Sequence, residues 1–168
     1  MQGDCLDLMK NIADKSVDMV LCDLPYGMVD CEWDSVISFE PLWEQYRRIC
    51  KENAAILLFA IQPFATDLIN SNRKMFRYDI IWEKSTKCGF FNAKKMPLRS
   101  HEEILIFYRK LPTYNPIKSK KDGVAIGRIR KKSKEFGNSV YKSTKCVSWR
   151  YEETGERYPT SYTFFKRY

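Results

Sequence analysis

The 168-residue sequence predicts one α/β domain with a mostly parallel sheet, followed by a basic region that shows no sustained periodicity. Three observations lead to this fold class. Short apolar runs alternate with amphipathic segments over residues 1–108. The length is sufficient for one domain with a core, and the hydrophobic fraction of 44% is that of a globular protein.

The expected elements follow from hydrophobic spacing and capping residues. Helices are expected at 5–13, with Asp4 as N-cap, at 38–53, with Ser38 as N-cap, and at 63–72, with Pro63 near the first turn. Strands are expected at 17–22, 54–60, 77–84 and 102–109. The near-continuous apolar run at 54–60 is typical of a strand buried on both faces of a parallel sheet.

Charge is distributed unevenly along the chain, whose formal net charge is +8. Residues 1–75 hold 7 Lys/Arg and 12 Asp/Glu, whereas residues 109–168 hold 16 Lys/Arg and 5 Asp/Glu with interspersed aromatics. The run "RIRKKSK" (128–134) is the densest basic stretch of that second region. Such a region favours a polyanionic partner, nucleic acid above all, and a solvated basic surface is an equally weighted alternative.

Cysteine usage and hydropathy indicate a cytoplasmic protein. The six cysteines form no C-x-x-C pair and the only histidine is His101, so we expect reduced thiols and no metal site. We interpret His101 as a hydrogen-bonded residue at the start of a strand. No apolar run approaches 18 residues and the N-terminus lacks the pattern of a signal peptide, so no membrane partner is expected.

The stretch "SVDMVLCDLPYGMVD" (16–30) carries the most specific chemistry. We expect Asp23 to Tyr26 to lie beyond the C-terminal end of a central strand, where open α/β sheets bind ligands. A strand-to-loop turn uses the same residue types. Here, however, a carboxylate that can accept from an amine, an extended residue before Pro25 and the flat face of Tyr26 occur together. Their combination predicts a pocket for a flipped base that carries an amino group.

"CDLPYG" resembles the Asp-Pro-Pro-Tyr motif of DNA amino-methyltransferases, which methylate adenine N6 or cytosine N4 from S-adenosylmethionine. "GDCLDLMKNIADKSVDMVLCDLPYG", "WDSVISFEPLWEQYRRICKENAAILLF", "IIWEKS" and "GFFNAKKMPLRSHEEILIFYRK" resemble successive segments of that family over residues 3 to about 110. Their order resembles the permuted class, in which the catalytic half comes first. The resemblance implies a Rossmann-like sheet of the S-adenosylmethionine-dependent type.

The resemblance also implies roles for individual residues. Asp23 accepts a hydrogen bond from the target amine, the carbonyl of Leu24 or Pro25 accepts the second, and Tyr26 stacks on the base. The cofactor site comprises Asp4, Cys5 and Asp23, with Asp4 at the adenine end of S-adenosylmethionine. The predicted contacts with double-stranded DNA are Lys94, Lys95, Arg128, Arg130, Lys131 and Lys132. For Lys84, Lys94 and Lys95, phosphate contact and simple solvation are both open alternatives.

The sequence departs from the family pattern in three places. Leu24 replaces a proline, the strand before Gly3 is nearly absent, and no Phe-x-Gly-x-Gly loop occurs. We therefore expect residues 1–108 to be a catalytic half and 109–168 a target-recognition region that ends before the cofactor-binding half. Such a chain would bind S-adenosylmethionine weakly or not at all by itself. Two alternatives for a partner are left open: a second chain that supplies the lost half, and a homodimer.

The leading hypothesis is a site-specific adenine-N6 DNA methyltransferase of a bacterial or phage restriction-modification type. The family more often carries serine at the first motif position when cytosine is the target, so Asp23 favours adenine. The alternatives are a cytosine-N4 methyltransferase and an inactive, truncated DNA-binding remnant.

Overall fold

The computed structural model of the chain describes residues 2–29, 31, 34–120, 129–131, 150–152 and 156–164. Two compact units are present: Met1–Tyr114 together with Thr160–Tyr168, and Asn115–Pro159. The first unit holds a five-stranded sheet and its helices, and the described part of the second holds two short two-stranded sheets. The predicted division of roles between residues 1–108 and 109–168 stays a prediction.

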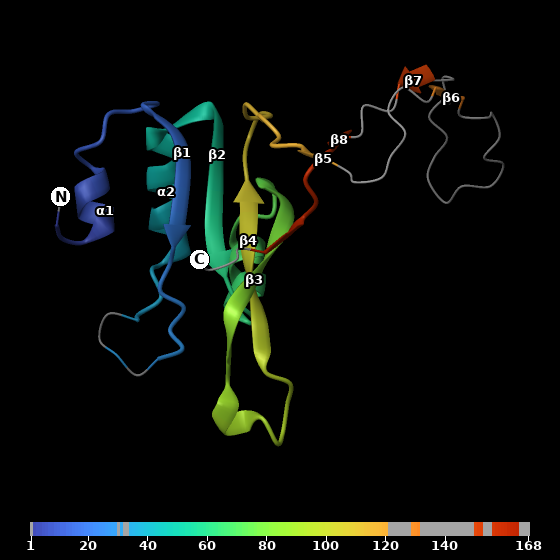
Figure 1. Ribbon diagram of the computed structural model, residues 1–168. Coiled ribbons are helices and arrows are strands. Elements are labelled where there is room, and N and C mark those ends of the chain that lie inside the picture. Colours follow the sequence, from blue (N-terminus) through green and yellow to red (C-terminus); the bar gives the residue numbers. More distant parts are fainter. Residues whose placement is uncertain are drawn as a thin grey trace. The chain divides into compact units, whose positions relative to one another are not determined.

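The sheet consists of β1 (Val17–Asp23), β2 (Cys50–Ala60), β3 (Phe76–Cys88), β4 (Arg99–Phe107) and β9 (Tyr162–Phe164), in the order β1-β2-β4-β3-β9 (Figure 1). β1 pairs with β2 in parallel, and β3 pairs with β9 in parallel. β4 is antiparallel to both β2 and β3. Every strand except β4 therefore runs in the same direction, which confirms the predicted α/β class with a mostly parallel sheet.

Helices α2 (Phe39–Ile49) and α3 (Phe64–Ser71) cover one face of the sheet, and the short α1 (Cys5–Met9) packs beside α2. Trp43 of α2 lies 4.9 Å from the ring of Phe107 in β4, and its Nε1 donates to Ser71 Oγ of α3 at 2.8 Å. These contacts join both helices to the sheet. Burial of their apolar side chains supplies the main stabilisation of the unit.

Three sequence expectations about these elements are wrong in detail. The helix expected at 38–53 ends at Ile49, because Cys50 already pairs with Val17 as the first residue of β2. The helix expected at 5–13 ends at Met9. The run 54–60 is fully buried on one face only: Ala54, Ile56, Leu58 and Ala60 lie in the core, while the residues between them are half-buried.

The strand that carries the motif lies at the edge of the sheet, not at its centre as expected. Within the described residues β1 pairs only with β2. Met19 and Leu21 are 58% and 57% exposed, because the helices cover the opposite face of the sheet. None of the described helices is long and apolar enough to cross a membrane.

The described part of the second unit consists of strand pairs. β5 (Ser119–Lys120) is antiparallel to β8 (Glu156–Arg157), and β6 (Ile129–Lys131) is antiparallel to β7 (Arg150–Glu152). Of the predicted DNA contacts, Arg130 and Lys131 belong to β6, although their side chains fall outside the described part of the structure. Arg128 and Lys132 lie wholly outside the described residues.

Candidate functional site

A pocket of about 580 Å³ opens at the edge of the sheet where β1 and β2 end and β4 begins. Its lining combines the motif, the residues that follow it, the residue after β2 and the first residue of β4: Asp23, Leu24, Pro25, Tyr26, Met28, Val29, Asp34, Ile61 and Arg99. This is the C-terminal edge of the parallel strands, where α/β sheets bind their ligands. Asp23, Leu24, Pro25 and Tyr26 are thus brought together in one cavity.

The motif is anchored by its second and fourth residues. Leu24 is only 6% exposed and belongs to the hydrophobic core. The ring of Tyr26 packs against Phe64 at the start of α3, with 5.2 Å between ring centroids. The leucine found in place of the family's proline therefore fixes the strand end by burial. Asp23 and Pro25 lie on either side of this fixed point.

Tyr26 and Asp23 form a hydrogen bond across the motif. The Tyr26 hydroxyl donates to Asp23 Oδ1. Burial, and after it the hydrogen bond to the Asp23 carboxylate, raises the pKa of Tyr26 far above its ordinary value. The phenol therefore stays protonated at neutral pH and remains a donor, which holds the Asp23 carboxylate in a defined orientation.

A second carboxylate organises the segment that follows. Asp34 is 7% exposed, and its Oδ1 accepts from the amides of Tyr26 at 2.8 Å and Gly27 at 3.1 Å. Its Oδ2 accepts from the amides of Met28 and Val29, each at 2.7 Å. We name residues 26–29 the motif loop. The Val29 amide first, and the other amides of the loop after it, hold the pKa of Asp34 below its usual range against the opposing effect of burial.

The predicted cofactor residues lie at the start of α1. Asp4 caps this helix, as expected, with Oδ1 accepting from the amides of Leu6 at 2.7 Å and Asp7 at 3.4 Å. Cys5 is exposed, and it lies near enough to Cys22 to add to the rise in the pKa of that thiol, which burial causes in the main. Since Cys22 directly precedes Asp23, the start of α1 lies near the strand end that carries the motif.

The three lysines for which phosphate contact was left open, Lys84, Lys94 and Lys95, differ in their surroundings. Lys84 forms an ion pair with Glu102 across β3 and β4, and this bond raises the pKa of the lysine. Lys94 and Lys95 are exposed in the segment between β3 and β4. His101, which follows Arg99 in β4, lines a smaller pocket of about 120 Å³ at the same edge of the sheet.

Sequence reasoning missed five residues of the main pocket: Met28, Val29, Asp34, Ile61 and Arg99. Asp34 precedes a predicted helix and gives no sign that its carboxylate turns back to the motif. Arg99 lies more than seventy residues from the motif, and only the strand pairing brings it to the pocket. Ile61 directly follows β2, and the residue after a parallel strand reaches this edge, so the apolar run that ends at Ala60 is the signal that could have located it.

Comparison with known proteins adds a family and a fold. Residues 17–164 match the profile of the N6/N4 DNA methylase family, described as DNA methylase. The solved PvuII DNA methyltransferase, described as cytosine-N4-specific, is 12% identical with a TM-score of 0.51, over 66% of this chain and 49% of that one. This likeness shows a shared fold.

Two other solved structures are similar at lower scores. The M1.HpyAVI–SAM complex is 14% identical with a TM-score of 0.47, over 74% of this chain and 61% of that one. A putative DNA modification methylase from Thermus thermophilus, complexed with S-adenosyl-L-methionine, is 17% identical with a TM-score of 0.48, over 68% and 56% of the two chains. The chain thus spans less than two thirds of the length of each of these structures.

Proposed function

Because this chain belongs to the N6/N4 DNA methylase family, we propose that it acts in methyl transfer from S-adenosylmethionine to an exocyclic amine of a base in double-stranded DNA. Adenine N6 is the preferred target and cytosine N4 the alternative. The observation that carries the proposal is the pocket at the end of β1, where Asp23 and Tyr26 lie beside the backbone of Leu24 and Pro25.

The pocket offers what an extruded aminated base requires. One amine hydrogen is donated to the Asp23 carboxylate and the other to the carbonyl of Leu24 or Pro25. These two acceptors turn the nitrogen lone pair out of the plane of the base and toward the methyl donor. The ring of Tyr26 stacks on the base, a contact worth about 1–3 kcal/mol. The volume of about 580 Å³ accommodates a nucleobase.

The residues at the start of α1 fit one end of the cofactor. Asp4 presents a carboxylate acceptor, and both of its capping bonds end on Oδ1, so that its capping role and a ligand role use different oxygens. Bound S-adenosylmethionine supplies the electrophilic methyl group. The sequence contains no Phe-x-Gly-x-Gly segment to surround the methionine end, so only the adenosine end is assigned to this chain.

The chain's own contribution to the reaction is orientation followed by proton acceptance. Holding the amine in line with the methyl group makes the reaction effectively unimolecular, which is the largest effect expected at such a site. The new nitrogen–carbon bond would form as the bond from the methyl group to the sulfonium sulfur breaks, with its electron pair left on sulfur. The amine gives up one proton, which the Asp23 carboxylate accepts. The Tyr26 hydroxyl remains bonded to Asp23 and keeps the carboxylate oriented.

Mass analysis of nucleosides from DNA incubated with the chain and S-adenosylmethionine tests the proposal. N6-methyladenine supports the preferred target and N4-methylcytosine the alternative, and Asp23→Ala should abolish either product. Absence of both products would refute methyl transfer by this chain. It would favour the second candidate, a DNA-binding protein without activity of its own, which the lack of a glycine-rich loop supports.

A further inference from the structure

The segment beyond the regular pairing of β3 with β4, which ends at Glu83 and His101, projects from the sheet. We name residues 84–99 the arm; it contains the C-terminal end of β3, the 3₁₀ helix η1 (Phe90–Asn92) and the first residue of β4. The β3–β4 register is irregular between Glu83 and Cys88, which is where the arm begins. Such an irregularity bends and twists a strand pair. Figure 1 shows the arm extending away from the five-stranded sheet.

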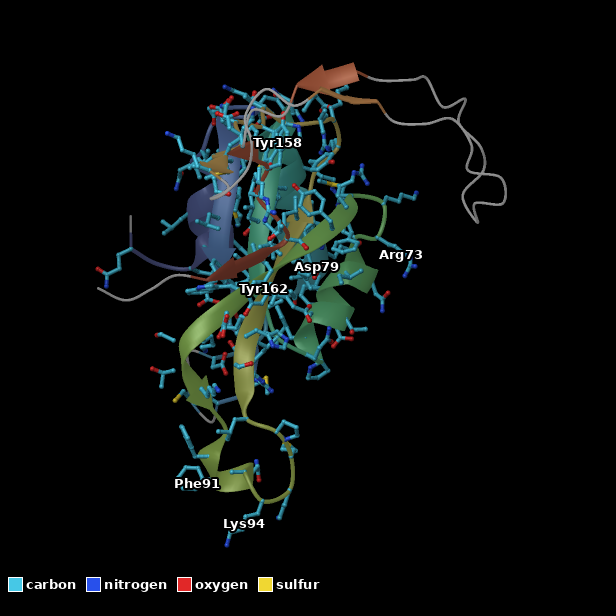
Figure 2. The ribbon with its side chains drawn as sticks, turned by 45° about the vertical axis from the view of Figure 1, so that its right-hand side comes forward. Arg73, Asp79, Phe91, Lys94, Tyr158 and Tyr162 are labelled. Carbon is cyan, nitrogen blue, oxygen red and sulfur yellow. The ribbon has the colours of Figure 1, made fainter. Side chains whose placement is uncertain are left out.

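The tip of the arm exposes large apolar side chains. Phe91 is 105% exposed, Phe90 64% and Met96 58%, and every residue from 85 to 97 is exposed. Figure 2 shows Phe91 and Lys94 at the far end of the arm. The tip therefore contributes nothing to the hydrophobic core, and its rings are available to a partner.

The charge of the arm indicates which partner this is. Residues 84–99 include Lys84, Lys87, Lys94, Lys95 and Arg99, and no Asp or Glu. Lys84 is paired with Glu102, and the other four cations lie in the same segment of the chain as the exposed rings. Exposed apolar rings in a segment whose charged side chains are all cationic match the base stack and the phosphates of a nucleic acid better than they match an apolar protein surface.

The direction of the strands brings the arm to the edge that carries the motif. β3 and β1 run in the same direction, so the C-terminal end of β3 and the end of β1 at Asp23 lie at the same edge of the sheet. Arg99, the last residue of the arm, lines the pocket with Asp23. A duplex that presents a base to this pocket therefore lies within reach of the arm.

We propose that the arm is a DNA-distorting wedge, in which Phe91 inserts between base pairs of double-stranded DNA while Lys94 and Lys95 contact phosphates. The inference rests on the proposed function, because it takes DNA as the partner of the neighbouring pocket. Inserted apolar side chains unstack one base step and kink the duplex. The kink lowers the cost of extruding a base beside it, and this base enters the pocket at Asp23.

Fluorescence energy transfer between dyes at the two ends of a duplex of about two helical turns tests the wedge, together with binding affinity at two salt concentrations. The wild-type chain should shorten the distance between the ends. Phe91→Ala should abolish the shortening and weaken binding by roughly tenfold, with an unchanged salt dependence. Lys94→Gln and Lys95→Gln should each lower the slope of log affinity against log salt by about 0.9 and keep the kink at saturation.

Tyr78→Ala is the matched control, because it removes a 46% exposed aromatic ring from the opposite end of β3. It should bind and bend DNA like the wild type. The wedge would be overturned if Phe91→Ala bends the duplex as much as the wild type does, or if Tyr78→Ala loses bending to the same extent as Phe91→Ala. If the exposed tip binds a protein and not DNA, Phe91→Ala should change neither the bending of the duplex nor the affinity for it. That result would also overturn the wedge.

The same variants separate this inference from the proposed function. If Phe91→Ala bends DNA normally while Asp23→Ala loses methyl transfer or base discrimination, the wedge is wrong and the proposed function stands. If Phe91→Ala loses the bend while Asp23→Ala retains base discrimination, the wedge stands and the role of Asp23 is wrong. If the wild-type chain does not bind duplex DNA at all, both are wrong.

Discussion

Replacing Gly27 by alanine should destabilise the motif loop through two effects that the structure separates. Gly27 has a φ of +67°, in the left-handed region that glycine adopts freely. A Cβ at this position would lie 2.8 Å from Val36 Cγ2, which is closer than van der Waals contact. The substitution therefore adds both backbone strain and a steric overlap, directly after the motif.

The magnitude of each effect follows from the geometry. The left-handed conformation costs a residue with a Cβ about 1–2 kcal/mol. Overpacking typically costs about 1–3 kcal/mol, and the low end applies here because Val36 is 48% exposed and can move outward. We therefore expect Gly27→Ala to lower the free energy of unfolding by about 2–3 kcal/mol.

Gly89→Ala is the matched control for the backbone effect. Gly89 has a φ of +93°, and a Cβ there would meet no heavy atom within 4 Å. Because Gly89 lies in the exposed arm, local opening can relieve its strain, and we expect a loss of about 1 kcal/mol or less.

Equilibrium urea unfolding of the wild type, Gly27→Ala, Gly89→Ala, Val36→Ala and the Gly27→Ala/Val36→Ala double variant is the assay. Removal of the Val36 methyl groups should restore about 1 kcal/mol of the stability lost in Gly27→Ala. The reasoning is refuted if Gly27→Ala costs no more than Gly89→Ala, or if Val36→Ala restores nothing in the double variant.

Three other predictions concern contacts around the site. The folded pKa of Asp34 is lowered, so its stabilisation is present above the unfolded pKa and is lost as pH falls through the folded value. The protection of the motif-loop amides, measured as their hydrogen-exchange rate relative to the intrinsic rate at each pH, should decrease over that range. The same decrease in Asp34→Asn would contradict this prediction. Lys84→Met should cost about 1–3 kcal/mol in urea unfolding by leaving the carboxylate of Glu102, only 14% exposed, without its cation, and Lys84→Arg should cost less. Trp43→Phe should lower the free energy of unfolding by about 1–2 kcal/mol, because the bond to Ser71 Oγ is lost. If the losses of Trp43→Phe and Ser71→Ala simply add in the double variant, the two side chains are not coupled and that bond is not the cause.

The sequence predicted the elements that carry strong local signals. The apolar run before Asp23 predicted β1 and the position of the motif at its end, and the spacing of Asp4 to the first helix predicted its capping bonds. These features depend on neighbours within a few residues, where periodicity and capping are informative.

Features that depend on distant residues were not predictable in the same way. Residues 50–53, with Lys51 and Glu52, resemble the end of a helix, but pairing of Cys50 with Val17 makes them strand. The edge position of β1 follows from pairing that no local pattern records. The bonds of Asp34 to four amides of the motif loop likewise depend on a reversal of the chain that composition does not reveal.

The exposure of the rings in the arm was likewise not predictable from the sequence. Lys84, Lys94 and Lys95 are candidate phosphate contacts from the sequence, and Phe90 and Phe91 have the composition of a core segment. Only the structure separates these rings from the core and shows them fully or largely exposed beside Lys94 and Lys95. An aromatic pair among cations packs in the core when it lies in a buried strand, whereas at the tip of a projecting hairpin it is available to a partner.

The central claim is that the pocket at Asp23 recognises the amino group of an extruded base, and one binding measurement tests it most directly. The affinity of the chain is measured for two duplexes that differ at a single unpaired position, which holds adenine in one and purine, without the amino group, in the other. Since a hydrogen bond to a charged group contributes about 1.5–3 kcal/mol, adenine should bind at least tenfold more tightly. Asp23→Ala should lose most of this preference, because the carbonyl of Leu24 or Pro25 is then the one acceptor left for the amino group. Equal affinity of the wild-type chain for adenine and purine would contradict the account.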